Sequence, residues 1–152
     1  MQSDPTAQAE KPRILIVDDN KGVLDFLILL LSKHEFCGLG ASSGAQCLEI
    51  VREQPIDLII LDVMMPVMDG LQVCQERKKI APEIPVILLT ARDNMITRAA
   101  AMELGVSEFV AKPVNNRDLL NRVRTQLRSV EWEKANEQAF SKIVAPAAAT
   151  KH

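Results

Sequence analysis

Short apolar runs alternate along the chain with segments whose apolar residues recur at helical spacing. The run at residues 13–17 is apolar after its first residue, which is typical of a strand buried on both faces of a sheet. Similar runs predict strands at residues 36–39, 56–61, 86–89 and 108–111. Helices are predicted at about residues 21–33, 43–53, 70–79, 94–104 and 116–130. This alternation predicts an α/β fold with a single doubly wound five-stranded parallel sheet and helices on both faces.

Capping and breaking residues set the limits of these elements. Asn20, Ser43 and Asp69 stand where side-chain oxygens cap helices, and Gly105 stands where a helix ends. The glycine-rich stretch at residues 38–44 resembles a dinucleotide-binding loop, but the strand before it is short and the chain has no second half of such a domain. We therefore discount a nucleotide site there.

The length of 152 residues fits one domain with tails. We expect a flexible tail over residues 1–11, a folded domain over residues 12–130, a helical extension over residues 131–144 and a disordered tail over residues 145–152. The apolar positions of the extension are out of phase with those of the helix before it. That shift favours a linker helix that leads to an output domain.

Composition narrows the function classes. The formal net charge of −2 provides no basic field for direct nucleic-acid binding. The longest apolar run, residues 26–31, is too short to cross a membrane. Cys37, Cys47 and Cys74 have no C-x-x-C spacing, so we expect buried free thiols in a reducing compartment. The N-terminus is polar and lacks the apolar core of a signal peptide, which together with the thiols predicts a cytoplasmic protein.

The residues that end the predicted strands carry the candidate chemistry. Asp18 and Asp19 follow the first strand, Asp62 the third, Thr90 the fourth and Lys112 the fifth. Ligands of open parallel sheets bind beyond the carboxyl ends of the strands, so these side chains are expected to converge. Crowded carboxylates repel one another, and Mg²⁺, which prefers carboxylate, water and phosphate oxygens, would relieve that repulsion. A lysine and a hydroxyl suit phosphoryl oxygens, and one positioned carboxylate can form an aspartyl-phosphate.

Motifs at these positions resemble one family. The sequence DVMMPVMDG at residues 62–70 resembles the phosphorylation-site loop of response-regulator receiver domains. The acidic pair at residues 18–19, LLTA at residues 88–91 and FVAKP at residues 109–113 resemble its other signatures and occur in the same order. The resemblance covers about residues 12–130. It implies the flavodoxin-like receiver fold with strand order 2-1-3-4-5 and a function in two-component signalling.

The resemblance also implies how the acidic residues act. Asp62 would accept the phosphoryl group from a histidine kinase or a phosphotransfer protein. Asp18, Asp19 and Asp62 would bind Mg²⁺ together with the backbone carbonyl of Met64. Such a domain catalyses only its own phosphorylation and dephosphorylation, so no turnover of another substrate is expected.

The remaining motif residues would read the phosphoryl group. Lys112 would contact it, and Thr90 would bond to it after transfer. Phe109 occupies the position of the aromatic switch residue, with a plain core role as the alternative. The Lys112–Pro113 bond would be cis. Phosphorylation would shift the population between two packings of the fourth helix and fifth strand, and so change the surface over residues 95–128.

Two surfaces are candidates for partners. The first predicted helix is apolar nearly all round, and the excess around Phe26 is a candidate docking surface for the phosphodonor, with a core-only role as the alternative. Four charged residues fall where one receiver subfamily pairs across a symmetric dimer, namely Arg98, Glu108, Asp118 and Arg122. We hypothesise that Arg98 faces Asp118 of a second chain and that Glu108 faces its Arg122. The alternative is solvated charges, since exposed pairs contribute only about 0–1 kcal/mol.

Two other classes share parts of this pattern. A pseudo-receiver has the same fold and takes no phosphate, but such modules usually lack one of the acidic or lysine positions, which this chain retains. An aspartate-based phosphatase also combines a parallel sheet with Mg²⁺, but it needs a second acid two residues after the nucleophile, where this chain has Met64. Self-phosphorylation by a small phosphodonor without turnover would separate a receiver from both.

Overall fold

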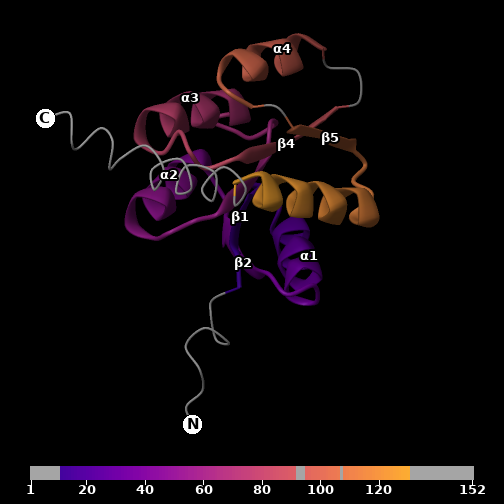
Figure 1. The fold of residues 1–152 in the computed structure, drawn as a ribbon. Coiled ribbons are helices and arrows are strands. Elements are labelled where there is room, and N and C mark those ends of the chain that lie inside the picture. The colour runs from indigo at the N-terminus through magenta and orange to yellow at the C-terminus, as the bar shows by residue number, and fades with distance from the viewer. Residues whose placement is uncertain (1–10, 92–94, 107, 131–152) are drawn as a thin grey trace, which may run out of the picture.

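The computed structural model describes residues 11–91, 95–106 and 108–130. Five strands form one parallel sheet in the order β2-β1-β3-β4-β5 (Figure 1). The strands are β1 (Arg13–Val17), β2 (Cys37–Ala41), β3 (Leu58–Asp62), β4 (Val86–Ala91) and β5 (Glu108–Lys112). The predicted α/β class, the five-stranded sheet and the strand order implied by the resemblance are confirmed.

Helices cover both faces of the sheet (Figure 1). They are α1 (Lys21–Ser32), α2 (Gly44–Glu53), α3 (Gly70–Ile80), α4 (Met95–Glu103) and a last helix at residues 116–130. Leucines of α1 and of the last helix pack in one hydrophobic cluster, and apolar residues of α2, α3 and α4 pack in the other. The sheet therefore separates the helices into two layers, as a doubly wound fold requires.

The central strand β3 explains the continuous apolar runs of the sequence. Ile59 and Leu61 pack on the side of α2 and α3, whereas Leu58 and Ile60 pack on the side of α1. All four side chains are fully buried. A strand with helices on both faces has no solvent side, so it shows no alternation of apolar and polar residues.

The predicted helix caps are confirmed wherever the structure describes them. The side chains of Asn20, Ser43 and Asp69 accept hydrogen bonds from the third backbone N–H of α1, α2 and α3, respectively. At the last helix Asn115 is the cap, because its Oδ1 accepts from the N–H of Asp118 at 2.9 Å. The predicted start of α4 at about residue 94 lies outside the described residues.

Strand β2 extends two residues further toward the site than the predicted limit of residue 39. Two of the glycines that looked like a loop, Gly38 and Gly40, lie within this strand, and Gly44 is the first residue of α2. A Cβ atom at Gly38 would lie 3.2 Å from the Cα atom of Ile28, because the backbone of α1 passes directly over β2. Close approach of backbones explains the glycine, and a dinucleotide loop is not needed to account for it.

The three cysteines are free, as predicted. Burial raises the pKa of Cys47 to about 12 and that of Cys74 to about 11, so both thiols are unreactive at neutral pH. Cys37 is only partly buried, which corrects the expectation for that residue, because β2 is an edge strand. No helix within the described ranges is long and apolar enough to span a membrane. The predicted extension and terminal tail at residues 131–152, and residues 1–10 of the predicted N-terminal tail, lie outside those ranges.

Candidate phosphoacceptor site

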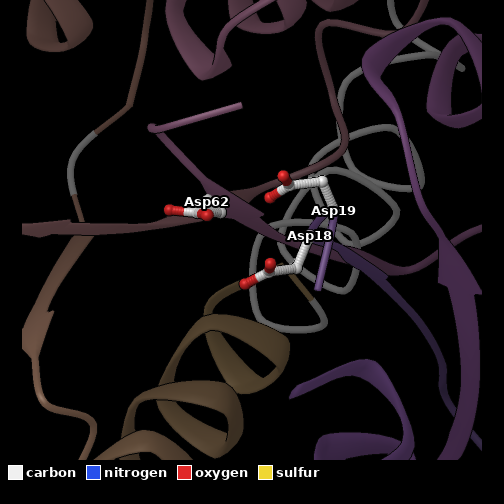
Figure 2. A group of neighbouring side chains, drawn as sticks. All are labelled: Asp18, Asp19 and Asp62. Carbon is white, nitrogen blue, oxygen red and sulfur yellow. The ribbon is translucent and has the colours of Figure 1, made fainter. Parts of the chain in front are cut away.

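Acidic side chains from two neighbouring strands meet at the carboxyl edge of the sheet (Figure 2). Asp18 and Asp19 directly follow β1, and Asp62 is the last residue of β3. One carboxylate oxygen from each of the three lies within 4.8 Å of the others. Asp18 and Asp62 are buried, whereas Asp19 is exposed. The convergence predicted from the strand ends is therefore present in the fold.

Asp62 is held by an ion pair and a backbone bond. Its Oδ1 accepts from Nζ of Lys112, the last residue of β5, at 2.6 Å and from the N–H of Met64 at 3.2 Å. The carboxylate is almost entirely buried, and the lysine is partly exposed. Burial of a carboxylate is costly unless it is paired, so the ion pair with Lys112 offsets part of the cost of burying Asp62.

Burial and the crowding of the carboxylates raise the pKa of Asp18. Burial is the largest cause that raises the pKa of Asp18, and the charges of Asp62 and Asp19 raise it further. The N–H of Asn20, which donates to Asp18 Oδ1 at 2.9 Å, and the charge of Lys112 act in the opposite direction. Three carboxylates thus share one ammonium group, and the site retains a negative potential.

Thr90 presents a buried hydroxyl with no bonding partner in the described part of the chain. The residue is 1% exposed, and its Oγ1 makes no hydrogen bond there. Thr90 pairs with Ala111, the residue before Lys112, so both polar groups lie at the same edge. A buried hydroxyl without a partner is uncommon in native proteins and indicates a place for an acceptor oxygen.

Phe109 is the second residue of β5. Its ring is partly buried against the α2–α3 side of the core. The guanidinium of Arg98, in α4, lies 5.5 Å from the ring centroid. The predicted cis bond between Lys112 and Pro113 is confirmed.

Gly70 is a site residue that the sequence analysis treated only as part of a motif. A Cβ atom there would lie 2.8 Å from both the backbone oxygen of Asp62 and the Cα atom of Val63. The first residue of α3 is therefore pressed against the end of β3, where any side chain would displace Asp62. The signal was the Asp-Gly pair, in which the cap residue is followed by the residue with no side chain.

A groove of about 460 Å³ runs from the acidic site to α1. Asp18 and Lys112 line it near the site, Pro113 lines it beside them, and Val23 and Phe26 line it on the helix. The ring of Phe26 is 51% exposed. The candidate docking residue thus lines the same groove as Asp18 and Lys112 of the acidic site.

The four candidate dimer residues are partly engaged within one chain. Arg122 bonds to Glu108 through Nη1 and to Asp118 through Nε, the latter at 3.1 Å. Glu108 also accepts from Gln126 at 3.3 Å. Any pairing of these groups with a second chain would exchange bonds that already exist.

The donor set of the acidic site fits Mg²⁺. Carboxylate oxygens of Asp18, Asp19 and Asp62 are close enough to share one small ion, and the exposure of Asp19 leaves room for water ligands. Mg²⁺ is bound in proteins by one or two carboxylates with water and phosphate oxygens, which matches this arrangement. The repulsion that raises the pKa of Asp18 would fall on binding.

Comparison with known proteins identifies the fold family. A sequence model described as the response regulator receiver domain matches residues 14–124. A solved receiver domain protein from Methanospirillum hungatei JF-1 is 27% identical with a TM-score of 0.78, and the match covers 82% of this chain and 99% of that one. One from Clostridium thermocellum is 32% identical with a TM-score of 0.75, covering 80% and 98%. NtrX from Brucella abortus is 25% identical with a TM-score of 0.78, covering 84% of this chain and 29% of that longer one.

These matches agree with the site. Receiver domains are signalling domains that bind Mg²⁺ through an acidic pocket and work with histidine kinases or phosphotransfer proteins and with output domains. The matched segment spans most of the chain and includes the acidic cluster, Thr90 and Lys112. The chain therefore belongs to the response regulator receiver domain family of two-component signalling.

Proposed function

We propose that this domain accepts a phosphoryl group on Asp62, in a Mg²⁺-dependent reaction, from a histidine kinase or phosphotransfer protein. The single observation that carries the proposal is the buried Asp62 carboxylate, paired with Lys112 at 2.6 Å beside two further carboxylates. The phosphoryl group then changes the surface formed by α4, β5 and the last helix, and that surface signals to a partner or an output domain.

In this proposal an oxygen of Asp62 attacks the phosphorus of the donor's phosphohistidine. The new P–O bond forms as the P–N bond breaks, and the donor's imidazole, protonated on its other nitrogen, leaves as neutral histidine. Both hydrogen bonds of the Asp62 carboxylate fall on Oδ1, and Oδ2 makes none among the described residues. We therefore assign the attack to Oδ2, while Lys112 and the Met64 N–H fix the plane of the carboxylate.

The remaining side chains have distinct tasks. Asp18, Asp19 and Asp62 would hold Mg²⁺, which when bound neutralises charge on the transferring phosphoryl oxygens. Lys112 stabilises the same developing charge from the other side of the site. The buried hydroxyl of Thr90 donates to a phosphoryl oxygen after transfer, and Phe109 follows the movement of Thr90.

Phe26 and the groove beside it form the proposed docking site for the phosphodonor. The groove connects α1 with Lys112 and Pro113, so a helix that carries a phosphohistidine can contact Phe26 while its imidazole faces Asp62. Exposed aromatic side chains beside a pocket often carry much of the binding energy of an interface. The free thiols support a reducing compartment, and we propose a cytoplasmic location.

Mass spectrometry with acetyl phosphate tests the acceptor role. We expect the wild type to gain the mass of one phosphoryl group in Mg²⁺, to gain none in a chelator, and Asp62→Asn to gain none. The control Asp25→Asn, which changes an exposed carboxylate paired with Lys21 on α1, should react as the wild type does. Unmodified wild type, or equal modification of Asp62→Asn, would contradict the proposal. Steady hydrolysis of p-nitrophenyl phosphate would instead indicate a phosphatase.

A further inference from the structure

A buried cation lies outside the phosphoacceptor site. Arg77, in the last turn of α3, is 4% exposed. Its hydrogen bonds go to the segment before β4 and to the connection between α4 and β5, at the amino edge of the sheet. Asp62 and Lys112 lie at the opposite, carboxyl edge. The proposed phosphotransfer chemistry does not use this residue, so its burial needs another explanation.

The guanidinium binds α3 to two other segments through backbone carbonyls. Nη1 donates to the oxygen of Pro82 at 3.0 Å and to that of Ile84 at 3.2 Å, both in the segment before β4. Nη2 donates to the oxygen of Leu104 at 3.1 Å, immediately after α4. Arg77 makes no ion pair with a carboxylate among the described residues, so its charge is stabilised by these carbonyls and by the more distant charge of Glu83.

The carboxyl end of α4 favours a positive charge beside it. Val106 N–H bonds to the oxygen of Ala101 at 3.0 Å and Gly105 N–H to that of Met102 at 3.1 Å, which closes the helix with a glycine in the left-handed conformation. The carboxyl end of a helix carries partial negative charge, and cations there are stabilising. Lys78 adds a second cation, with Nζ 3.4 Å from the oxygen of Glu103.

The carboxyl end of α4 is therefore held by a buried cation. Ala101 near the carboxyl end is fully buried, whereas Ile96 in the first turn is 86% exposed. Nε of the Arg77 guanidinium has no hydrogen-bond partner among the described residues, so release of the Leu104 carbonyl would leave Nη2 without one as well, which is costly in a buried group. At the amino end, Arg98 lies 5.5 Å from the ring centroid of Phe109, and α4 follows β4, whose Thr90 lies at the edge of the phosphoacceptor site. This end therefore adjoins the residues that respond to phosphorylation in the proposed function.

We propose that Arg77 is a positioning residue that fixes the carboxyl end of α4 as a pivot, so that phosphorylation moves α4 from its amino end. This proposal rests on the proposed function, because it describes how the signal from Asp62 reaches the surface of α4. It assigns to Arg77 the coupling between acceptor site and surface, and no part in phosphotransfer itself.

Hydrogen exchange of the unphosphorylated protein tests the anchor alone. We expect Arg77→Met to accelerate exchange of the Gly105 and Val106 amides on the order of tenfold, the effect of losing one charge-assisted hydrogen bond, while the amides of α1 are unchanged. The matched control is Lys79→Met on the same helix, because Lys79 is exposed and its ion pair is with Glu76, one turn away on α3. Equal exchange at Gly105 and Val106 in Arg77→Met and wild type would overturn the anchor.

Spin-label distances test the pivot in a Cys37→Ser background. One label on the exposed Glu49 of α2 is combined with a label at Ile96 or at Met102, both exposed on α4. With Mg²⁺ and beryllofluoride as the phosphoryl mimic, we expect the distance from residue 96 to change and that from residue 102 to stay, and in Arg77→Met the distance from residue 102 to change as well. Equal movement of both positions in wild type, or a fixed residue 102 in Arg77→Met, would overturn the pivot.

Binding of the mimic separates this proposal from the one on which it rests. If fluorine NMR detects no bound beryllofluoride on the wild type, the proposed function fails and the pivot fails with it, while the exchange result still decides whether Arg77 holds α4. If the mimic binds to wild type and Arg77→Met alike and the distances behave as stated, both proposals are supported.

Discussion

Asp18 is the side chain on which the charge balance of the acidic site most depends. Burial, opposed by the Asn20 N–H and supported by the Asp62 charge, raises its pKa above the ordinary value. The folded state then binds this proton more tightly than the unfolded state does. Stability contributed by the protonated form is therefore present at low pH, and it is lost as the pH rises from the ordinary pKa of 3.8 through the raised one. At neutral pH Asp18 is charged, and burial of this charge next to Asp62 and Asp19 destabilises the metal-free domain.

Asp18→Asn should stabilise the metal-free protein and weaken its response to Mg²⁺. The amide keeps an oxygen for the Asn20 N–H and removes one charge, so we expect a melting temperature a few degrees higher at neutral pH in a chelator. The gain should shrink as the pH approaches 3.8, where the wild-type carboxyl also becomes neutral. Saturating Mg²⁺ at about 100 times its Kd would stabilise the wild type by about 2.7 kcal/mol, and the variant by less.

Thermal scans of both proteins, with Asp25→Asn as a control for the loss of any one carboxylate, provide the measurement. Asp25 is exposed and paired with Lys21, so its replacement should change neither quantity by much. A metal-free Asp18→Asn that melts below the wild type, or an undiminished response to Mg²⁺, would show that the acidic cluster is not under electrostatic strain.

Among the elements, α1 offers two matched apolar residues for a test of docking. Phe26 and Leu29 are 51% and 54% exposed on the same helix, but only Phe26 lines the groove that reaches Lys112. Both can be changed to serine with little effect on the core, since Leu24, Leu27 and Leu31 provide the buried face of α1. The pair therefore separates a position in the groove from apolar exposure in general.

The phosphodonor for this test is the phosphorylated histidine kinase or phosphotransfer protein that phosphorylates the wild type fastest. Phe26→Ser should slow transfer from this donor on the order of tenfold or more, the effect of losing a central interface contact. Leu29→Ser should transfer at nearly the wild-type rate. Both variants should react normally with acetyl phosphate, which needs no docking surface. Rapid-quench measurement of the phosphorylated fraction gives the transfer rates of the wild type and of the two serine variants. Equal rates of transfer from the histidine protein to Phe26→Ser and Leu29→Ser would exclude docking at the groove.

Elements and strand ends could be predicted from the sequence because local rules fix them. Runs such as residues 58–61 are apolar throughout only where helices cover both faces, and Asn20, Ser43 and Asp69 cap helices through bonds to the next turn. Parallel strands bring their carboxyl ends to one edge, so the meeting of Asp18 with Asp62 followed from topology.

The parts that sequence reasoning missed depend on distant contacts. Nothing next to Arg77 in the sequence indicates burial, because its carbonyl partners at Pro82, Ile84 and Leu104 are brought together only by the packing of α3 on α4. The length of β2 was missed for a related reason, since Gly40, which lies beyond the predicted limit, appears as a turn residue until Ile28 and Leu24 of α1 pack against it. Local propensity gives way to such tertiary contacts.

At the scale of the whole molecule, the two edges of the sheet carry different groups of polar contacts. The carboxyl edge gathers Asp18, Asp62 and Lys112, and the amino edge carries the Arg77 contacts that tie α3 to the end of α4. The proposed signal enters at the first edge and leaves on the outer surface of α4, β5 and the last helix. Binding of a second chain to that surface depends on whether its charged side chains are already paired within one chain.

The charges on that surface limit what a dimer could gain. Arg122 already bonds to Glu108 and Asp118 in its own chain, so the hypothesised pair between Glu108 and Arg122 of a second chain replaces an existing bond. Each exposed ion pair contributes about 0–1 kcal/mol, and exchange leaves less. We therefore expect a monomer in the absence of phosphoryl mimic, and a dimer only when the mimic also changes the packing of α4 and β5.

Sedimentation with Mg²⁺ and beryllofluoride tests the hypothesised pair between Arg98 and Asp118. Arg98→Asp alone would set two aspartates against each other across a symmetric dimer, and Asp118→Arg alone would set two arginines, so each variant should remain monomeric. When the two variants are mixed, each of these positions would meet the opposite charge on the other chain, and the dimer should return. Contacts within one chain cannot produce that recovery, because mixing leaves them unchanged. A wild type that stays monomeric with the mimic bound, or a mixture that does not associate, would leave these residues as solvated charges.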